Sequence, residues 1–366
     1  MHSTTTKSQQ GRGVIERYRE FLPVSPSTPV ISLGEGNTPL IHSSRLSERV
    51  GRGGEVFVKN EGLNPTGSFK DRGMTVAVSR ALERGTTALI CASTGNTSAS
   101  AAAYAARAGI SCVVILPVGK IATGKLLQAF AYGAKIVAID GNFDDALRIV
   151  RKLGESGEFA IVNSINPDRV AGQKTAAFEI VDELGDAPDF HLLPVGNAGN
   201  ITAYWAGYRK YLACERSTRL PAMIGLQAVG AAPIFYDCII DKPETIASAI
   251  QIGNPASWLQ ALAAIVESRG AIDVVTDDDI LAAQSWLAQN EGIFVEPASA
   301  ASIAGLFKWC DSGDATYSFR EIREGTRIVC TVTGHGLKDP DVIIGRMKEL
   351  KPVAATVSDV RRAIGL

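Results

Sequence analysis

The stretch Asn64-Pro65-Thr66-Gly67-Ser68-Phe69-Lys70-Asp71-Arg72-Gly73 joins an apolar strand candidate at 56–59 to a helical pattern, and Lys70 lies just inside the expected helix. A helix dipole disfavours a cation near the N-terminal end, so the Lys70 amine should lose its proton more readily than that of an exposed lysine. A neutral amine is the form that attacks a carbonyl group to make a Schiff base. The alternative is an ordinary lysine that pairs with Asp71 or a later acidic residue, which is the commoner role of a lone lysine near a helix start.

The same ten residues resemble the cofactor-lysine segment of pyridoxal-phosphate enzymes of fold type II, the tryptophan-synthase-like type. Their order looks most like the form found in threonine synthases. The resemblance implies that Lys70 holds pyridoxal 5'-phosphate as an imine and serves as the catalytic residue. It extends over nearly the whole chain, from about Leu33 to Asp339, with the other motifs in the family's order.

The composition is that of an ordinary globular protein, with 46% hydrophobic and 20% charged residues in a chain of 366 that is long enough for two domains. A formal net charge of -1 argues against a surface that binds nucleic acid or an anionic membrane. The six cysteines lack metal-ligand spacing and predict buried thiols in a reducing compartment, with no metal site. Residues 1–13 are polar, and no apolar run approaches the roughly 18 residues of a membrane span. We therefore expect a cytoplasmic protein, although a transit function of the polar start stays open.

Short β-rich runs alternate with helical segments, a pattern that predicts βαβ crossovers and parallel sheets. The runs are 87–91, 112–116, 135–139, 191–195, 223–227 and 327–331. We expect an α/β protein of two domains, each a largely parallel twisted sheet flanked by helices, and the resemblance implies the architecture of fold type II enzymes. The smaller domain is placed at 44–158 and the larger at 1–43 plus 159–366, with the cofactor between them.

Two helices are predicted from their end signals. Thr276, with Asp279 three residues later, is an approximate capping box before an apolar helix face. Asn166 as the N-cap and Pro167 at the first helical position begin a second helix, which Gly185 ends.

A glycine-rich turn at 195–201 follows a strand candidate and precedes a helix. Backbone N–H groups and the positive end of the helix dipole make such junctions suitable for phosphate. The turn lacks the GxGxxG pattern and the lysine of a P-loop, which weakens both nucleotide-binding hypotheses. A lone motif of this kind is more often a plain tight turn. Together with Lys70, it resembles the family's cofactor-phosphate cup, which implies phosphate contacts from Gly196, Asn197, Ala198, Gly199 and Asn200.

A second junction, Ser93-Thr94-Gly95-Asn96-Thr97, precedes an Ala-rich helix. Small hydroxyl residues and free amides at a helix start suit a carboxylate, although a cluster of N-cap residues is the simpler explanation when the loop stands alone. In the resembled family this loop holds the α-carboxylate of the substrate. The resemblance implies that Ser93, Thr94 and Thr97 contact the substrate and that Asn96 donates a hydrogen bond to the phenolic oxygen of the cofactor.

Arg169 falls in the first turn of the helix that begins after Asn166. A cation at this end of a helix is unfavourable unless an anion binds between them. The alternative is a pair with Asp168 or Glu179, which the spacing favours about as well.

The segment 164–180 resembles the region of threonine synthases that binds the phosphate of O-phosphohomoserine. The resemblance implies that Ser164 and Arg169 contact this leaving phosphate, with Asn197 and Thr97 nearby. This feature separates threonine synthases from relatives that use the same cofactor.

The late strand candidate runs into Thr333-Gly334-His335-Gly336. In the resembled family the hydroxyl residue before such a GxG faces the pyridine nitrogen, which implies this role for Thr333 and a ring nitrogen left largely unprotonated. The alternative for Thr333 is a plain turn residue, and His335 receives no chemical role. The stretch 292–300 resembles a pocket wall and helix start, and its Glu296 receives no role either.

The resemblance implies a lyase that converts O-phospho-L-homoserine and water to L-threonine and phosphate by γ-elimination and β-replacement. A dehydratase of threonine or serine, or a cysteate-synthase-like enzyme acting on phosphoserine, would keep the cofactor and change the substrate. A non-catalytic Rossmann-like nucleotide-binding protein is the alternative from another class. A homodimer is expected from the family alone.

Overall fold

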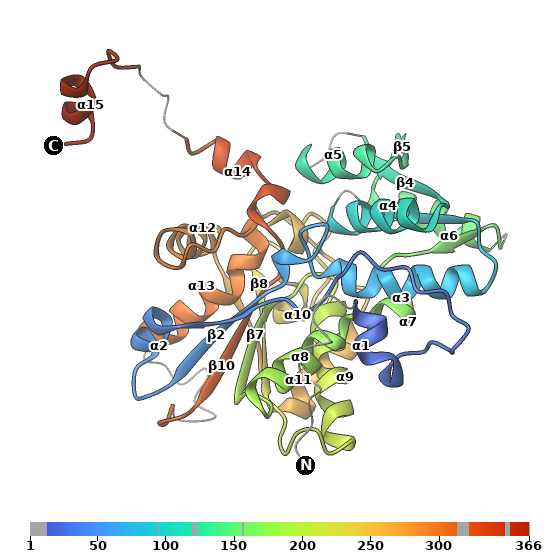
Figure 1. Ribbon diagram of the computed structural model, residues 1–366, viewed down its shortest axis with the longest axis horizontal. Coiled ribbons are helices and arrows are strands. Elements are labelled where there is room, and N and C mark those ends of the chain that lie inside the picture. The colour runs from blue at the N-terminus through green and yellow to red at the C-terminus, as the bar shows by residue number, and fades with distance from the viewer. Residues whose placement is uncertain are drawn as a thin grey trace.

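A computed structural model of the chain describes residues 13–93, 95–118, 123–155, 157–312, 322–347 and 352–365. The predicted substrate residue Thr94 and the polar first dozen residues lie outside the described residues. The strands form two sheets, one of six strands in the order β1-β2-β10-β7-β8-β9 and one of four in the order β5-β4-β3-β6 (Figure 1). The predicted α/β class with parallel sheets is confirmed.

The six-stranded sheet is parallel except for β1, which pairs antiparallel with β2. Its central strands β7 and β8 are buried throughout, because helices cover both faces of the sheet, and this explains why they read as continuous apolar runs. Its strands are β1 (Leu40–Ser43), β2 (Glu55–Asn60), β7 (Phe190–Pro194), β8 (Ala222–Ala228), β9 (Ala271–Val275) and β10 (Arg327–Val332). The four-stranded sheet is wholly parallel and consists of β3 (Ala88–Ala92), β4 (Ser111–Pro117), β5 (Lys135–Ile139) and β6 (Phe159–Ile161).

The two sheets divide the chain at other residues than the expected domain boundaries of 44 and 158. Strand β2 pairs with β1 and β10, so 55–60 belongs to the six-stranded sheet. Strand β6 pairs with β3, so 159–161 belongs to the four-stranded sheet. The expected boundaries separate β2 and β6 from their sheet partners, because strand partners are set by long-range hydrogen bonds rather than by order along the chain.

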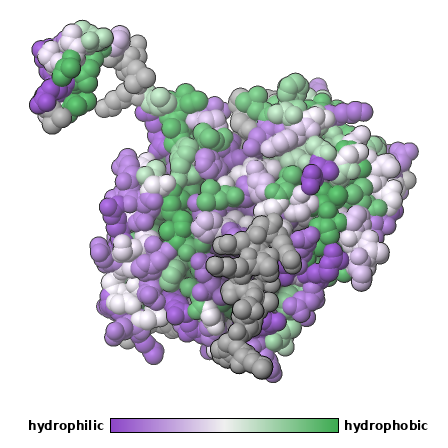
Figure 2. All heavy atoms as spheres, viewed as in Figure 1, coloured by the Kyte–Doolittle hydropathy of each residue, from purple (hydrophilic) through white to green (hydrophobic). Residues whose placement is uncertain are grey.

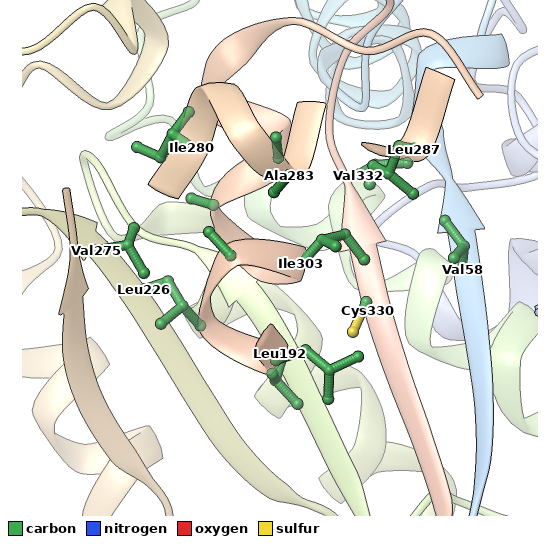
Figure 3. Packing of buried hydrophobic residues seen from close by; sticks show 14 of the residues in the cluster. Val58, Leu192, Leu226, Val275, Ile280, Ala283, Leu287, Ile303, Cys330 and Val332 are labelled. Atoms are coloured by element: carbon green, nitrogen blue, oxygen red, sulfur yellow. The ribbon is translucent and has the colours of Figure 1, made fainter. Parts of the chain in front are cut away.

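Helices cover each sheet on both faces. On the six-stranded sheet, α2 (Ser44–Val50), α12 (Asp277–Trp286) and α13 (Pro297–Ser312) pack on one face, and α1 (Val14–Tyr18), α8 (Thr175–Leu184), α9 (Gly199–Ala213) and α11 (Trp258–Ser268) on the other. Figure 3 shows Ile280, Ala283 and Leu287 lying over the same core as Ile303 and the strand residues. On the four-stranded sheet, α3 (Lys70–Glu83), α4 (Asn96–Ala108) and α5 (Thr123–Ala131) lie opposite α6 (Phe143–Gly154).

The remaining elements are short. They are α7 (Pro167–Gln173), α10 (Pro233–Tyr236), α14 (Asp341–Ile344), α15 (Val357–Ala363), the 3-10 turns Arg19–Phe21, Glu61–Leu63, Ser248–Ile250 and Gly336–Lys338, and a π-helical turn at Leu287–Glu291. In the described part of the chain, no helix is both long and apolar enough to cross a membrane.

The predicted helix ends are confirmed, with one interruption. Thr276 and Asp279 form a capping box, in which each side chain bonds the other's backbone N–H at 2.9–3.1 Å. Asn166 accepts from the first-turn N–H groups of α7, and Gly185 ends α8 in the left-handed region at φ 79°. The helix predicted between them is two helices, α7 and α8, that meet at Lys174.

Helices α3 and α7 cross at two glycines. A Cβ atom on Gly73 would lie 2.6 Å from the carbonyl oxygen of Arg169, and one on Gly172 would collide with the carbonyl oxygen of Arg72. The two backbones therefore touch with no side chain between them. This contact brings the first turn of α7, with Arg169, against the first turn of α3, with Lys70.

Arg72 is fully buried between two carboxylates. Its Nε donates to Glu61 at 2.7 Å, and its Nη atoms donate to Glu179 at 2.6 and 2.8 Å. Lys59 donates to the same Glu179 at 2.8 Å, and the Thr38 hydroxyl donates to Glu61 at 2.7 Å. Burial alone would raise the pKa of each carboxyl, but Arg72 and then Lys59 hold both below the ordinary range. Each buried charge thus has an opposite partner and further hydrogen bonds, the condition under which ions are tolerated in a core.

We predict that Arg72→Met lowers the free energy of unfolding by about 3–5 kcal/mol, because it leaves two carboxylates buried without their main partner. Urea denaturation measures the change. Arg209→Ala is the control, since Arg209 pairs with Glu267 at 3.0 Å on the surface and its loss should cost at most about 1 kcal/mol. Equal effects of the two substitutions would contradict a structural role of the buried cluster.

Candidate active site

The predicted site loops follow the carboxyl ends of neighbouring parallel strands. The turn at 196–200 follows β7 and the segment at 333–336 follows β10, which pairs with β7. The loop at 93–97 follows β3 and the turn at 163–166 follows β6, which pairs with β3. Open α/β sheets bind ligands at these ends of their strands.

Lys70 is the first residue of α3, and the segment before it is pinned to the loop after β10. The Phe69 N–H donates to the Thr333 carbonyl at 3.0 Å, and Ser68 forms a β-bridge with Gly334. The Lys70 amine lies 4.3 Å from the centre of the Phe69 ring. The segments 68–70 and 333–334 are far apart in the sequence. Their backbone hydrogen bonds nevertheless bring Lys70 close to Thr333.

The environment of Lys70 favours a neutral amine. Burial and, after it, the positive charge of Arg169 lower its pKa to about 7, against the opposing charge of Glu296. The direction agrees with the expectation from the helix dipole, but burial is the larger cause. Asp71 accepts from the Thr66 hydroxyl and the Ser100 hydroxyl, both at 2.6 Å. Among the ion pairs of the described residues none includes Lys70, so the expected alternative of a pair with Asp71 is wrong.

Asn96 begins α4 and faces a carboxylate from the other sheet. Its Nδ2 donates to Glu296 Oε1 at 2.7 Å, and its Oδ1 is buried without a hydrogen-bond partner in the protein. Buried polar atoms nearly always have partners, so an unpaired one marks a place for a polar atom of a ligand.

Thr333 is held by the start of α13. The Ser299 hydroxyl oxygen accepts from the N–H groups of Thr333 and Gly334 at 3.0 and 2.7 Å, and it lies 2.9 Å from the Thr333 hydroxyl. The Ser299 hydroxyl has one proton to donate, and its acceptor is either the Gly334 carbonyl at 3.2 Å or the Thr333 hydroxyl. If Ser299 donates to Thr333, the Thr333 proton points to a further acceptor. This geometry suits a hydrogen bond from Thr333 to a neutral ring nitrogen.

The turn between β7 and α9 has the shape of an anion cup. Ala198 adopts the left-handed region at φ 62°, and α9 begins at the next residue, Gly199. A Cβ atom on Gly196 would lie 3.0 Å from Cα of Ile250, so a side chain here would crowd the neighbouring backbone. The Asn200 Nδ2 is buried and has no partner in the protein. Free donors at a helix N-terminus are suited to phosphate.

One end of the Asn197 side chain already has a hydrogen-bond partner in the protein. Its Oδ1 accepts from the Ala256 N–H at 3.3 Å, and its carbonyl accepts from the Ser257 N–H at 3.2 Å. These contacts fix the turn against the loop before α11. The amide nitrogen of Asn197 is therefore the end of the side chain that is left to serve a ligand.

Arg169 is fully buried and incompletely paired. Its Nη1 donates to the Val162 carbonyl at 3.0 Å and approaches the Thr97 hydroxyl at 3.4 Å, while Nε and Nη2 have no partner in the protein. The two expected pairs are both wrong, because Asp168 pairs with Arg84 and Glu179 pairs with Arg72. Burial lowers the pKa of Arg169 only to about 10, so it stays positive at neutral pH. A buried guanidinium with free donors is suited to bind an anion.

The two loops of the four-stranded sheet are tied together by Asn163. Its side chain donates to the Ala92 carbonyl at 2.8 Å and accepts from the Ala92 N–H at 3.1 Å. Ser164 therefore sits directly beside the loop that contains Ser93, whose hydroxyl accepts from the Gly95 N–H at 3.1 Å. Of the small polar residues expected here, Thr97 contacts Arg169, at 3.4 Å.

Taken together, the unpaired atoms fit pyridoxal phosphate and an anionic substrate. One unpaired donor, Nδ2 of Asn200, lies at the turn 196–200, and two more, Nε and Nη2, belong to Arg169. An amine with a lowered pKa, Lys70, is tied by its backbone neighbours to Thr333.

A family model described as pyridoxal-phosphate dependent enzyme matches residues 31–334. The chain is 58% identical over 332 residues to the threonine synthase of Halalkalibacterium halodurans, covering 91% of each protein. It is 55% identical over 363 residues to the threonine synthase of Mycobacterium leprae, covering 99% of this chain and 98% of the relative. The chain belongs to the threonine synthase family of pyridoxal-phosphate-dependent enzymes. The alternative hypothesis of a non-catalytic Rossmann-like nucleotide-binding protein is therefore wrong.

Solved structures with the same fold are more distant in sequence. Maize serine racemase superposes with a TM-score of 0.71 at 20% identity, covering 85% of this chain and 92% of that one. O-ureido-L-serine synthase also gives 0.71, at 19% identity, covering 87% and 95%. At this identity the likeness shows the fold alone, which is fold type II.

The sequence assigned no role to two side chains that the structure places at the site. Glu296 holds Asn96, and Ser299 holds Thr333. Both lie at the start of α13, in the stretch 292–300 that resembles a pocket wall and helix start. Their signal in the sequence was present, since Glu296 is a charged residue inside an apolar run directly before Pro297.

We predict that the apoenzyme regains pyridoxal phosphate at a rate that rises with pH through a midpoint near 7, because only the neutral Lys70 amine attacks a carbonyl. The amine is protonated below this pH and neutral above it, so the rate levels off on the alkaline side. Growth of the visible absorbance band after mixing measures the rate. A midpoint above about 9, near that of an exposed lysine, would contradict the effect of burial.

Proposed function

We propose that this protein converts O-phospho-L-homoserine and water to L-threonine and phosphate. The observation that carries the proposal is Arg169, a fully buried guanidinium with two unpaired donors, packed beside the helix that begins with Lys70. A substrate whose leaving group is a phosphate gives these donors their partner. The curated relatives named threonine synthase support the same reaction.

The proposed cofactor contacts come from four segments. Lys70 binds the aldehyde carbon, Asn96 donates to the phenolic oxygen, and Thr333 donates to the ring nitrogen. The phosphate lies in the cup of Gly196, Asn197, Ala198, Gly199 and Asn200, supported by the free donor of Asn200 and the left-handed Ala198. Bound pyridoxal phosphate supplies an electron sink for the carbanion chemistry.

The proposed substrate contacts lie on the side of the four-stranded sheet. Ser93 and Thr97, with Thr94 between them, bind the α-carboxylate at the start of α4. Ser164 and Arg169 bind the leaving phosphate, with Asn197 and Thr97 close by. The 3.4 Å approach of Arg169 to Thr97 supports a shared anion region, because Asn163 ties the turn before α7 to the end of β3, just before α4.

Lys70 is the proposed proton carrier. Once the substrate amine has taken its place, the free Lys70 amine would remove one proton from Cα and one from Cβ, and phosphate would leave from Cγ. The two protons would return at Cγ and Cα, while water adds its hydroxyl at Cβ and its proton goes to the released phosphate. A pKa near 7 suits this role, since the group is then both a usable base and a usable acid at neutral pH. The positive charge of Arg169 contributes to the lowered pKa of the Lys70 amine.

We predict that the purified protein releases phosphate from O-phospho-L-homoserine and forms L-threonine in equal amounts. Lys70→Ala should lose both activities and the visible cofactor band, because the imine partner is gone. A colorimetric phosphate assay and amino-acid analysis measure the products. Phosphate release without threonine, or none at all, would overturn the proposal.

We predict that Arg169→Ala keeps the visible cofactor band and lowers kcat/KM for O-phospho-L-homoserine by roughly 100-fold or more. Two charge-assisted hydrogen bonds of about 1.5–3 kcal/mol each are lost. Arg84→Ala is the control, since Arg84 is 56% exposed and lies at the end of α3, paired with Asp168. Loss of the cofactor band in Arg169→Ala would place Arg169 at the cofactor and refute its assignment to the leaving group.

The nearest rivals keep the cofactor and differ in substrate. A dehydratase would release ammonia from threonine or serine, and a cysteate-synthase-like enzyme would release phosphate from phosphoserine. Parallel assays with these three amino acids decide among the activities. Neither rival has a specific observation in its favour beyond the common cofactor site.

We further propose a homodimer located in the cytoplasm. The seven-residue helix α15 stands apart from the body, with Val357, Val360 and Ile364 exposed on it (Figures 1 and 2). A helix of this length is marginal in water without packing, which supports a covering surface on a second copy. The six free cysteines support a reducing compartment.

A further inference from the structure

We propose that Glu296 is a positioning residue of the active site, whose carboxylate orients the amide of Asn96 and supplies a negative charge to the Lys70 side of the pocket. The inference rests on the proposed cofactor contact of Asn96. It goes beyond the family's cofactor lysine and phosphate cup, to which Glu296 does not belong.

The backbone fixes Glu296 firmly. Its N–H donates to the Gly334 carbonyl at 3.0 Å, its carbonyl accepts from the Ser299 N–H at 3.0 Å, and Pro297 follows it as the first residue of α13. The residue is 1% exposed. A Cβ atom on Gly334 would collide with the Glu296 carboxylate, so the glycine of the segment after Thr333 is needed to make room for this side chain.

The contact with Asn96 is directional. A carboxylate only accepts hydrogen bonds, so it selects the amide nitrogen of Asn96 and not the amide oxygen. The distance from Nδ2 to Oε1 is 2.7 Å, short for a neutral donor and typical of a charged acceptor. The nitrogen keeps a second hydrogen. Because Glu296 holds the first, the second is available to the phenolic oxygen of the cofactor.

Lys70 is flanked by opposite charges. Arg169 approaches from α7 and lowers the pKa of Lys70, whereas Glu296 approaches from the start of α13 and raises it. On α3 itself, Asp71 is held by Thr66 and Ser100 and has Lys338 nearby. Removal of the Glu296 charge would leave the positive charge of Arg169 unopposed at the amine.

Two variants separate the two roles. Glu296→Gln keeps an oxygen acceptor and nearly the same shape but removes the charge, whereas Glu296→Asp keeps the charge and shortens the reach to Asn96. In the holoenzyme without substrate, the pH midpoint of the visible cofactor band should fall by about one unit or more in Glu296→Gln, since an opposite charge near an amine is worth about that much. It should stay near that of the unchanged protein in Glu296→Asp.

The positioning role is tested with a double-mutant cycle. If Glu296 acts through Asn96, the effects of Glu296→Asp and Asn96→Ala on cofactor affinity should be strongly non-additive. Glu291→Gln is the matched control, because Glu291 lies just upstream and accepts from Ser43 at 2.8 Å, away from Lys70. Thermal melts confirm that each variant is folded.

An unchanged pH midpoint in Glu296→Gln would overturn the electrostatic role, and additive effects in the cycle would overturn the positioning role. Both measurements use the spectrum of the bound cofactor and need no substrate. A shifted spectrum in a protein that releases no phosphate from O-phospho-L-homoserine would therefore support the role of Glu296 while refuting the proposed reaction.

Discussion

The buried ion cluster around Arg72 is the interaction on which the active site depends. Of the three consecutive charged residues at the start of α3, Asp71 binds Thr66 and Ser100, and Arg72 joins Glu61 to Glu179. Lys70 takes part in no ion pair of the described residues. Glu61 follows a strand of the large sheet and Glu179 belongs to a helix that covers it. Arg72 thus fastens the helix that begins with Lys70 to the six-stranded sheet and its helices.

The candidate site lies at the carboxyl ends of strands of both sheets. Its unpaired hydrogen-bond donors are buried side-chain nitrogen atoms. Asn200 and Arg169 keep unpaired nitrogen atoms in buried positions, which costs free energy in the protein alone. Such groups are retained where a ligand completes them. The proposed cofactor donor, Asn200, lies on α9 of the six-stranded sheet, and the proposed substrate donor, Arg169, lies on α7, which follows β6 of the four-stranded sheet. In this proposal the two anions bind at separate places, so one can stay while the other leaves.

Local sequence patterns predict most of the helices and strands. They do not predict the contacts between elements that are distant in the sequence. The β-rich runs, the Thr276 capping box and the stop at Gly185 are all signals within a few residues, and the structure contains each of them. The contact between Asn96 and Glu296 spans 200 residues and leaves no local trace. The short strand β6 was assigned to the larger domain for the same reason, since its partner β3 lies far away in the chain.

The contact of α3 with α7 at Gly73 and Gly172 limits the ways in which the substrate preference can change. With no side chain between them, the two helices form one rigid block, and a shift of the Arg169 backbone would push on Arg72 and its carboxylates. Acceptance of a different leaving group must therefore come from exchanged side chains at unchanged backbone positions, such as Thr97 or Ser164. In the proposed site, exchange of such side chains would change the substrate preference. The backbone contact of α3 and α7 would meanwhile keep the spacing between Lys70 and Arg169.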